Sequence, residues 1–75
     1  MHDAQKMVEV FQTNIRTKSK ARKIKAALLL LMPNARISFD LEDCDHILRI
    51  ENESIATAFL LELLISEKVA AQVLQ

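Results

Sequence analysis

Two stretches in which apolar residues recur at helical spacing, each lying between segments with strand-like patterns, constrain the fold of this 75-residue chain most strongly. Residues three or four positions apart share one face of a helix. The first set with this spacing is Ala21, Ile24, Ala27, Leu28 and Leu31. The second set is Ile55, Phe59, Leu60, Leu63 and Leu64. We therefore predict two helices, each with an apolar side available for packing.

Polar residues and a proline predict where these helices begin and end. Thr17 is suited to the N-cap of the first helix, because its hydroxyl can accept a hydrogen bond from an amide of the first turn. Pro33-Asn34 is expected to end that helix. The second helix is predicted to start at Asn52 or Ser54 and to end near Glu67.

Four segments rich in β-branched or alternating apolar residues are predicted to be strands: 7–15, 36–41, 46–51 and 69–74. In the first of them the buried face is ambiguous, because Val8 and Val10 lie on one side and Phe11 and Ile15 on the other. The resulting order is strand, helix, strand, strand, helix, strand. That order is typical of two split βαβ units.

The order predicts an α+β fold, a ferredoxin-like βαββαβ sandwich in which a four-stranded antiparallel sheet carries both helices on one face. Residues 1–6 are predicted to be a flexible start, and residues 7–75 a single domain. Residues 42–45 are short enough to join two strands as a hairpin.

The composition argues against several classes of function. The chain has no glycine, so no glycine-rich loop can hold a phosphate, and left-handed backbone is expected at asparagine or aspartate instead: Asn14, Asn34, Asn52, and Asp43 or Asp45. No serine has the histidine and carboxylate partners of a catalytic triad. We therefore expect neither enzymatic activity nor a cofactor.

The single cysteine, Cys44, cannot form a disulfide within the chain and suits a reducing compartment. No apolar leader opens the sequence, and the longest apolar run, residues 26–32, is too short to cross a bilayer. These features predict a cytoplasmic protein without a transmembrane segment.

A run of basic residues at the start of the first helix is the best lead toward a function. Residues 16–25 hold six cations and no anion, in a chain with ten basic and ten acidic residues: Arg16, Lys18, Lys20, Arg22, Lys23 and Lys25. Cations are unfavourable at a helix N-terminus. The run is either a solubilising surface or a site for an acidic protein partner or another anion. Nucleic acid is less expected, because the net charge is zero and the first strand lacks paired aromatics for base stacking.

The element order, residues 39–51 and the closing VAAQVL resemble the heavy-metal-associated domain family of small copper chaperones, in a divergent bacterial form. Members of that family bind a soft metal ion through Cys-x-x-Cys at the start of helix one. The resemblance places those two cysteine positions at Thr17 and Lys20. Neither side chain replaces a thiolate as a ligand of Cu(I). The resemblance therefore implies this fold with its soft-metal site lost.

Four carboxylates lie within six positions at the end of the second predicted strand and in the turn after it: Asp40, Glu42, Asp43 and Asp45. We expect this turn at the opposite end of the sheet from the loop before helix one. The molecule would then be an electric dipole, which favours head-to-tail self-association. Cys44 and His46 also lie here and could hold Zn²⁺ or Cu²⁺ weakly, which leaves open a metal-handling protein with a displaced site.

Surplus leucines provide a second candidate surface. Leu29 and Leu30 lie on the side of the first helix opposite Ile24 and Leu28, and contiguous exposed apolar area marks an interface. The sequence thus predicts a small non-enzymatic interaction module, possessing a basic helix start and exposed leucines that bind an acidic partner or a second copy. Metal handling at Cys44 and His46, and binding of anions or nucleic acid, are the alternatives.

Overall fold

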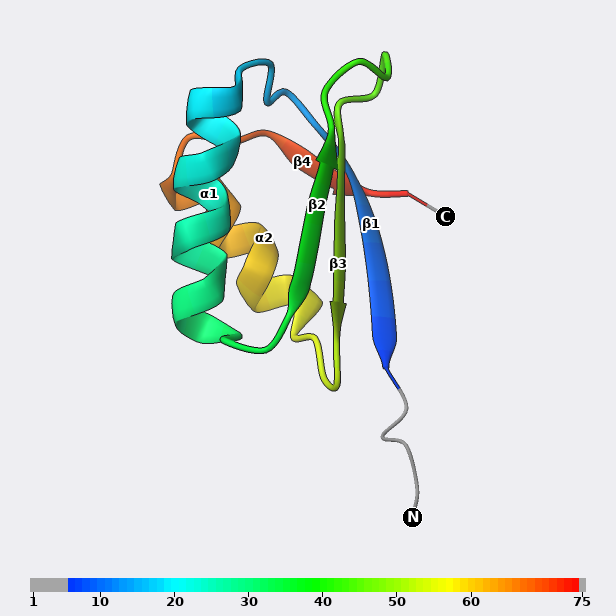
Figure 1. Ribbon diagram of the computed structural model, residues 1–75, viewed down its shortest axis with the longest axis vertical. Coiled ribbons are helices and arrows are strands. Elements are labelled where there is room, and N and C mark those ends of the chain that lie inside the picture. Colours follow the sequence, from blue (N-terminus) through cyan, green and yellow to red (C-terminus); the bar gives the residue numbers. More distant parts are fainter. Residues whose placement is uncertain (1–5, 75) are drawn as a thin grey trace.

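The computed structural model describes residues 6–74, which form six elements in the predicted order (Figure 1). They are β1 (Met7–Thr13), α1 (Lys18–Leu31), β2 (Arg36–Asp40), β3 (Ile47–Asn52), α2 (Thr57–Ser66) and β4 (Ala71–Val73). Of the predicted flexible start, residues 1–5 lie outside the described part. Neither described helix has the length and apolar character needed to cross a membrane.

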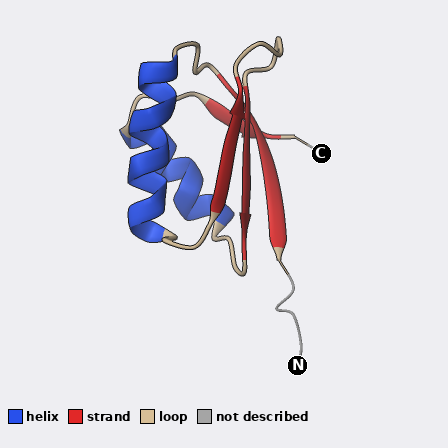
Figure 2. Ribbon diagram, in the orientation of Figure 1, coloured by secondary structure: helices blue, strands red, loops and turns tan. Residues whose placement is uncertain are grey.

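The four strands form one antiparallel sheet in the order β2-β3-β1-β4. Each βαβ unit is split by a strand of the other unit, because β3 lies between β1 and β2 while β1 lies between β3 and β4. Both helices lie on the same face of the sheet (Figures 1 and 2). This arrangement confirms the predicted ferredoxin-like α+β sandwich.

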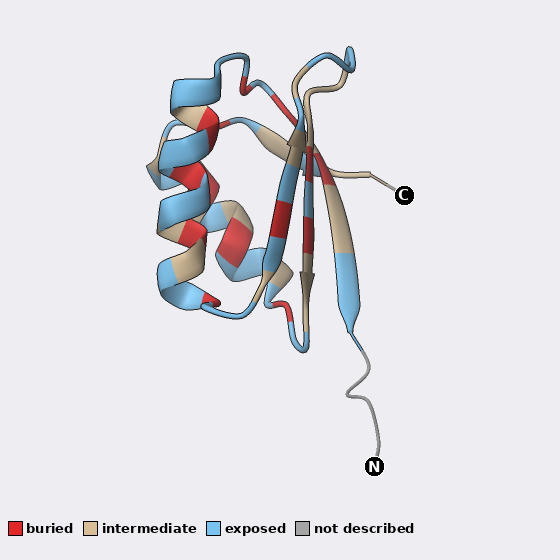
Figure 3. Cartoon of the chain, in the orientation of Figure 1, coloured by how far each residue is buried: buried red, intermediate tan, exposed pale blue. Residues whose placement is uncertain are grey.

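The core lies between the helices and the sheet, on the sides that face each other (Figure 3). Six of the ten apolar residues with helical spacing are buried there: Ala21, Ile24, Leu28, Ile55, Leu60 and Leu64. In β1 it is Phe11 that faces the helices, fully buried opposite Leu48 of β3, whereas Val8 remains 44% exposed. Strand alternation then places Val10 on the outer face with Val8, which settles the ambiguity of the first strand.

Two expectations about the helical faces are wrong. Leu31 is 44% exposed, because it is the last residue of α1, where the chain turns back toward the sheet. The next residue, Met32, is buried in its place, and its amide donates to the Leu28 carbonyl oxygen at 2.9 Å. Phe59 is 54% exposed and so lies largely outside the core.

The start of α2 also differs from the prediction. β3 continues through Asn52, which pairs with Met7 of β1, so the helix begins only at Thr57. Ala56 is the N-cap and offers no side-chain hydrogen bond, while the Asn52 amide donates to the Ser54 carbonyl oxygen at 2.9 Å. Neither Asn52 nor Ser54 therefore caps the helix.

Left-handed backbone occurs at residues other than those expected. Among the described residues, the non-glycine positions with positive φ are His46 (47°) and Lys68 (63°). Lys68 follows α2 in a Schellman motif, in which the Val69 amide donates to Leu64 O at 2.8 Å and the Lys68 amide to Ile65 O at 2.9 Å. Val69 and Leu64 are both buried, which anchors this turn to the core.

Candidate functional site

The acidic turn and the basic start of α1 lie at the same end of the sheet, not at opposite ends as predicted (Figure 1). β1 and β2 are parallel, because each is antiparallel to β3, so the loop after β1 and the turn after β2 leave the sheet at one end. Thr13 joins the two segments: its amide donates to Asp45 O at 3.0 Å and its hydroxyl to His46 O at 2.6 Å. The predicted dipole was therefore wrong, and the head-to-tail association inferred from it loses its basis.

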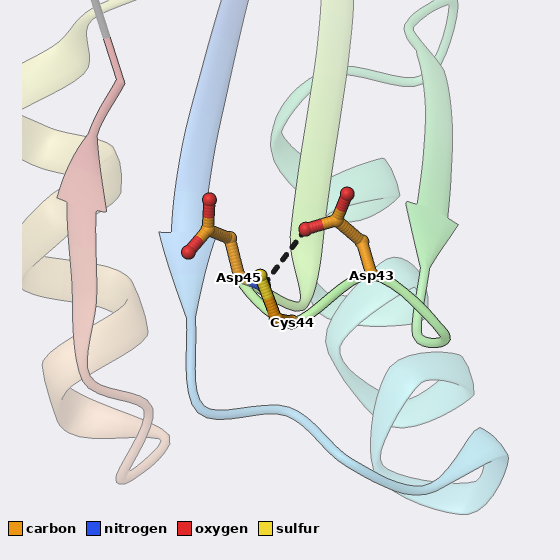
Figure 4. Close-up of side chains that lie close together, drawn as sticks. All are labelled: Asp43, Cys44 and Asp45. Atoms are coloured by element: carbon orange, nitrogen blue, oxygen red, sulfur yellow. Dashed lines mark hydrogen bonds between the residues drawn. The ribbon is translucent and has the colours of Figure 1, made fainter.

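Two carboxylates of the acidic turn hold its backbone in place. Asp40 Oδ1 accepts a hydrogen bond from the Asp43 amide at 3.2 Å. Asp43 Oδ1 accepts one from the Asp45 amide at 2.8 Å (Figure 4). Aspartate commonly stabilises turns in this way. This local role accounts for part of the acidic cluster without a ligand.

Of the two predicted metal ligands, Cys44 belongs to the cluster of possible ligand atoms that the fold brings together, and His46 does not. The side chains whose ligand atoms lie within 4.8 Å of one another are Asp43, Cys44 and Asp45 (Figure 4). His46 Nδ1 instead lies 3.2 Å from the Leu41 carbonyl oxygen. A carbonyl can only accept, so this bond places the proton on Nδ1 and leaves only Nε2 as a ligand atom.

The residues at the two positions where the resemblance places cysteines both have structural roles. Thr17 is the N-cap of α1, as predicted, and its hydroxyl accepts a hydrogen bond from the Lys20 amide at 3.1 Å. Lys20 Nζ reaches across to α2 and donates to the Glu67 carbonyl oxygen at 2.6 Å. Glu67 is the C-cap of α2, where backbone carbonyls lack helical partners.

The contact of Lys20 explains a cation in the first turn of α1. The ammonium is unfavourable beside the N-terminus of its own helix but favourable at the C-terminus of α2, which carries partial negative charge. Lys20 is partly buried, and its ammonium is already bonded within the chain. The structure thus gives Lys20 a structural role, while its role in binding a partner stays a prediction.

Three of the other predicted basic residues line a groove between α1 and β2. Lys18, Arg22 and Lys25 are exposed and lie four and three positions apart along one side of the helix. The facing wall consists of residues 37–42, and the cavity between the walls has a volume of about 510 Å³. Arg16 and Lys23 are exposed but do not line this cavity.

A second cavity of about 410 Å³ continues along the strand. It shares Lys25, Ile37 and Ser38 with the first and extends to Arg36 and Arg49. We call the combined depression the α1–β2 groove. Its charged lining residues are five basic and two acidic: Lys18, Arg22, Lys25, Arg36, Arg49, Asp40 and Glu42.

Arg36 and Arg49 were missed in the sequence, because their contribution depends on β2 being an edge strand next to β3. The two predicted interface leucines also differ from each other in the structure. Leu30 is 85% exposed, whereas Leu29 is partly buried against the core and lines the groove.

Comparisons with protein-family models, with curated proteins and with solved structures found no match to this chain. The resemblance to heavy-metal-associated domains therefore stays a prediction from the sequence.

Proposed function

We propose that this chain is a non-enzymatic protein-interaction domain that binds an acidic segment of a partner protein in the α1–β2 groove. The observation that carries the proposal is the line of Lys18, Arg22 and Lys25 along the helical wall of the groove. Unlike Lys20, these side chains are exposed. Charges arranged in this way attract an acidic partner from solution and orient it.

The walls of the groove also favour a polypeptide over a nucleic acid. Ile37, Phe39 and Leu41 line it and provide apolar surface at the side of the strand. Phe39 is the aromatic residue of this lining and is partly buried. Single-stranded nucleic acid binds on several exposed aromatic rings along a basic track, an arrangement that the lining of this groove does not provide.

The proposal also accounts for the positions at which heavy-metal-associated domains carry their cysteines. Thr17 caps α1 and Lys20 binds the end of α2, so both positions stabilise the fold in place of a metal site. The exposed Cys44 suits a reducing compartment, so we place the protein in the cytoplasm.

Fluorescence anisotropy with a defined probe tests this function. The probe is a fluorescein-labelled seven-residue peptide of sequence DEVEIDE with a capped C-terminus. We expect it to bind, and to bind more weakly at ~300 mM than at ~50 mM NaCl, because salt screens exposed charges. A peptide of sequence KKVKIKK with the same label should not bind.

Matched charge reversals locate the binding surface. Lys25→Glu reverses a charge in both cavities of the groove, and we expect it to weaken binding about tenfold, since an exposed pair contributes up to ~1 kcal/mol and reversal adds repulsion. Lys23→Glu reverses a charge on the same helix outside the groove and should change the affinity less than about twofold. Absence of DEVEIDE binding at low salt, or equal effects of the two reversals, would contradict the proposal.

A further inference from the structure

The free edge of β2 is the feature from which a binding mode can be derived. β2 is the outermost strand at one side of the sheet, and it pairs only with β3 among the described strands. An edge strand presents backbone N–H and C=O groups that can pair with another chain. Extended peptides are recognised in this way in several families of domains.

The shape of the groove shows that this edge is accessible. The first cavity touches residues 37–40 of β2, which are consecutive in the strand, and residues 41 and 42 of the turn after it. Successive residues of a strand point to opposite faces of the sheet, so a cavity that touches all of them follows the backbone edge and not one face. The helix leaves open a space beside the strand instead of covering it.

We propose that the acidic partner segment binds as an extended strand that pairs with the edge of β2 and continues the sheet beneath α1. This inference rests on the proposed function and specifies the conformation of the bound segment. The backbone edge supplies the hydrogen bonds, and the surrounding side chains select the sequence.

The charges flanking the edge define the chemistry of that strand. Side chains of an added strand alternate between the helical face and the outer face of the sheet. On the helical face they meet Arg22 and Lys25, beside Phe39. On the outer face they meet Arg36 and Arg49, which alternate with the buried Ile37 and Ile50. Asp40 also lies on this face, at the end of β2, where its Oδ1 accepts a hydrogen bond from the Asp43 amide. Cations on both sides match a segment in which acidic residues flank apolar ones.

A second copy of this chain matches the edge less well. If two β2 edges paired around a two-fold axis, their α1 helices would lie side by side on the same face of the joined sheet. Lys18, Arg22 and Lys25 of one copy would then face the same three cations of the other. Like charges in this arrangement repel, and an acidic segment relieves that repulsion.

The other edge of the sheet provides an internal comparison. β4 pairs with β1 over only three residues, Ala71–Val73, and short edge strands limit pairing with other chains. The cavity beside it has a volume of about 240 Å³, and its lining residues carry no charged side chain: Gln12, Thr13, Asn14, Ala70, Ala71 and Gln72. An acidic strand is therefore expected at β2 and not at β4.

Two peptides of equal charge separate strand addition from binding by charge alone. DEVEPDE differs from DEVEIDE by one proline, which removes a backbone donor and fits poorly within a paired strand. We expect DEVEIDE to bind about tenfold more tightly than DEVEPDE to the full chain, because ladder pairing is lost. Amide hydrogen exchange, measured with and without DEVEIDE, should slow within residues 36–41 and stay unchanged within residues 71–73.

Three other results of these experiments would overturn strand addition at β2. Equal affinities for the two peptides, with unchanged exchange in β2, would overturn strand addition while leaving the proposed function intact. Failure of both peptides to bind would remove the proposed function and this inference together. Slow exchange in β2 of the free protein, accompanied by a dimer in sedimentation, would assign the edge to a second copy and overturn the inference.

Discussion

Replacing Lys20 with methionine tests why a cation stands in the first turn of α1. Lys20→Met removes the ammonium that donates to Glu67 O at 2.6 Å and keeps an unbranched apolar stem of similar helix propensity. The variant leaves the last carbonyl of α2 without this partner. We therefore expect the free energy of unfolding to fall.

The expected change in the free energy of unfolding is the sum of two opposing contributions. A hydrogen bond from a charged donor contributes about 1.5–3 kcal/mol when well formed, and partial exposure of Lys20 reduces this. Removing a cation from the N-terminal turn of α1 stabilises the folded state by roughly 0.3–1 kcal/mol, because the cation interacts unfavourably with the helix dipole. The net loss should be about 1 kcal/mol, which lowers the melting temperature of a domain of this size by about 4–8 °C.

Lys18→Met is the matched control for this experiment. It removes the same charge from the same turn of α1, but Lys18 is exposed and lines the groove instead of contacting α2. Urea unfolding followed by circular dichroism should show no loss of stability, or a gain of a few tenths of a kcal/mol (roughly 0.3) from the helix dipole. Equal unfolding free energies for the two variants would refute the role assigned to Lys20.

Three further changes test the fold by urea unfolding. Lys68→Gly should raise the free energy of unfolding by about 0.5–1 kcal/mol, because glycine tolerates the φ of 63° at the end of α2; a decrease would contradict the Schellman assignment. Thr17→Ala should lower the free energy of unfolding by about 1 kcal/mol through loss of the N-cap, whereas Thr17→Ser keeps a capping hydroxyl and should lose little stability. Leu28→Ala should cost about 2–5 kcal/mol, because Leu28 is fully buried, and the same change at the exposed Leu30 should cost under about 0.5 kcal/mol; similar losses at both sites would refute the placement of the core.

Features determined by neighbouring residues were predicted well from the sequence. The Thr17 cap and the apolar face of α1 depend on spacings of three and four residues, which can be read directly. The order of helices and strands then limited the fold to a single sandwich. These predictions needed no knowledge of contacts between distant segments.

Features determined by distant contacts were missed or misplaced. Asn52 looks like a helix cap locally, but its pairing with Met7 keeps it in β3. The bond from Lys20 to Glu67 spans 47 residues, and no local pattern indicates it. The acidic turn was placed at the wrong end, because its position follows from the parallel direction of β1 and β2 and not from its composition.

The α1–β2 groove could be predicted only in part, because it depends on a local sequence pattern and on contacts between distant segments. The basic residues of α1 were identified in the sequence, but which of them share one surface was not. Lys18, Arg22 and Lys25 face the edge of β2, while Lys20 turns to α2. The edge itself follows from the strand order, which places β2 outermost.

Mapping the DEVEIDE peptide on the ¹⁵N-labelled protein by NMR tests the central claim most directly. We predict that the largest amide shift changes lie in residues 18–25 of α1 and 36–41 of β2, with peptide-to-protein contacts between backbone protons along β2. Changes centred instead on Val8 and Val10 of the outer sheet face, or on residues 71–73 of β4, would contradict binding in the α1–β2 groove.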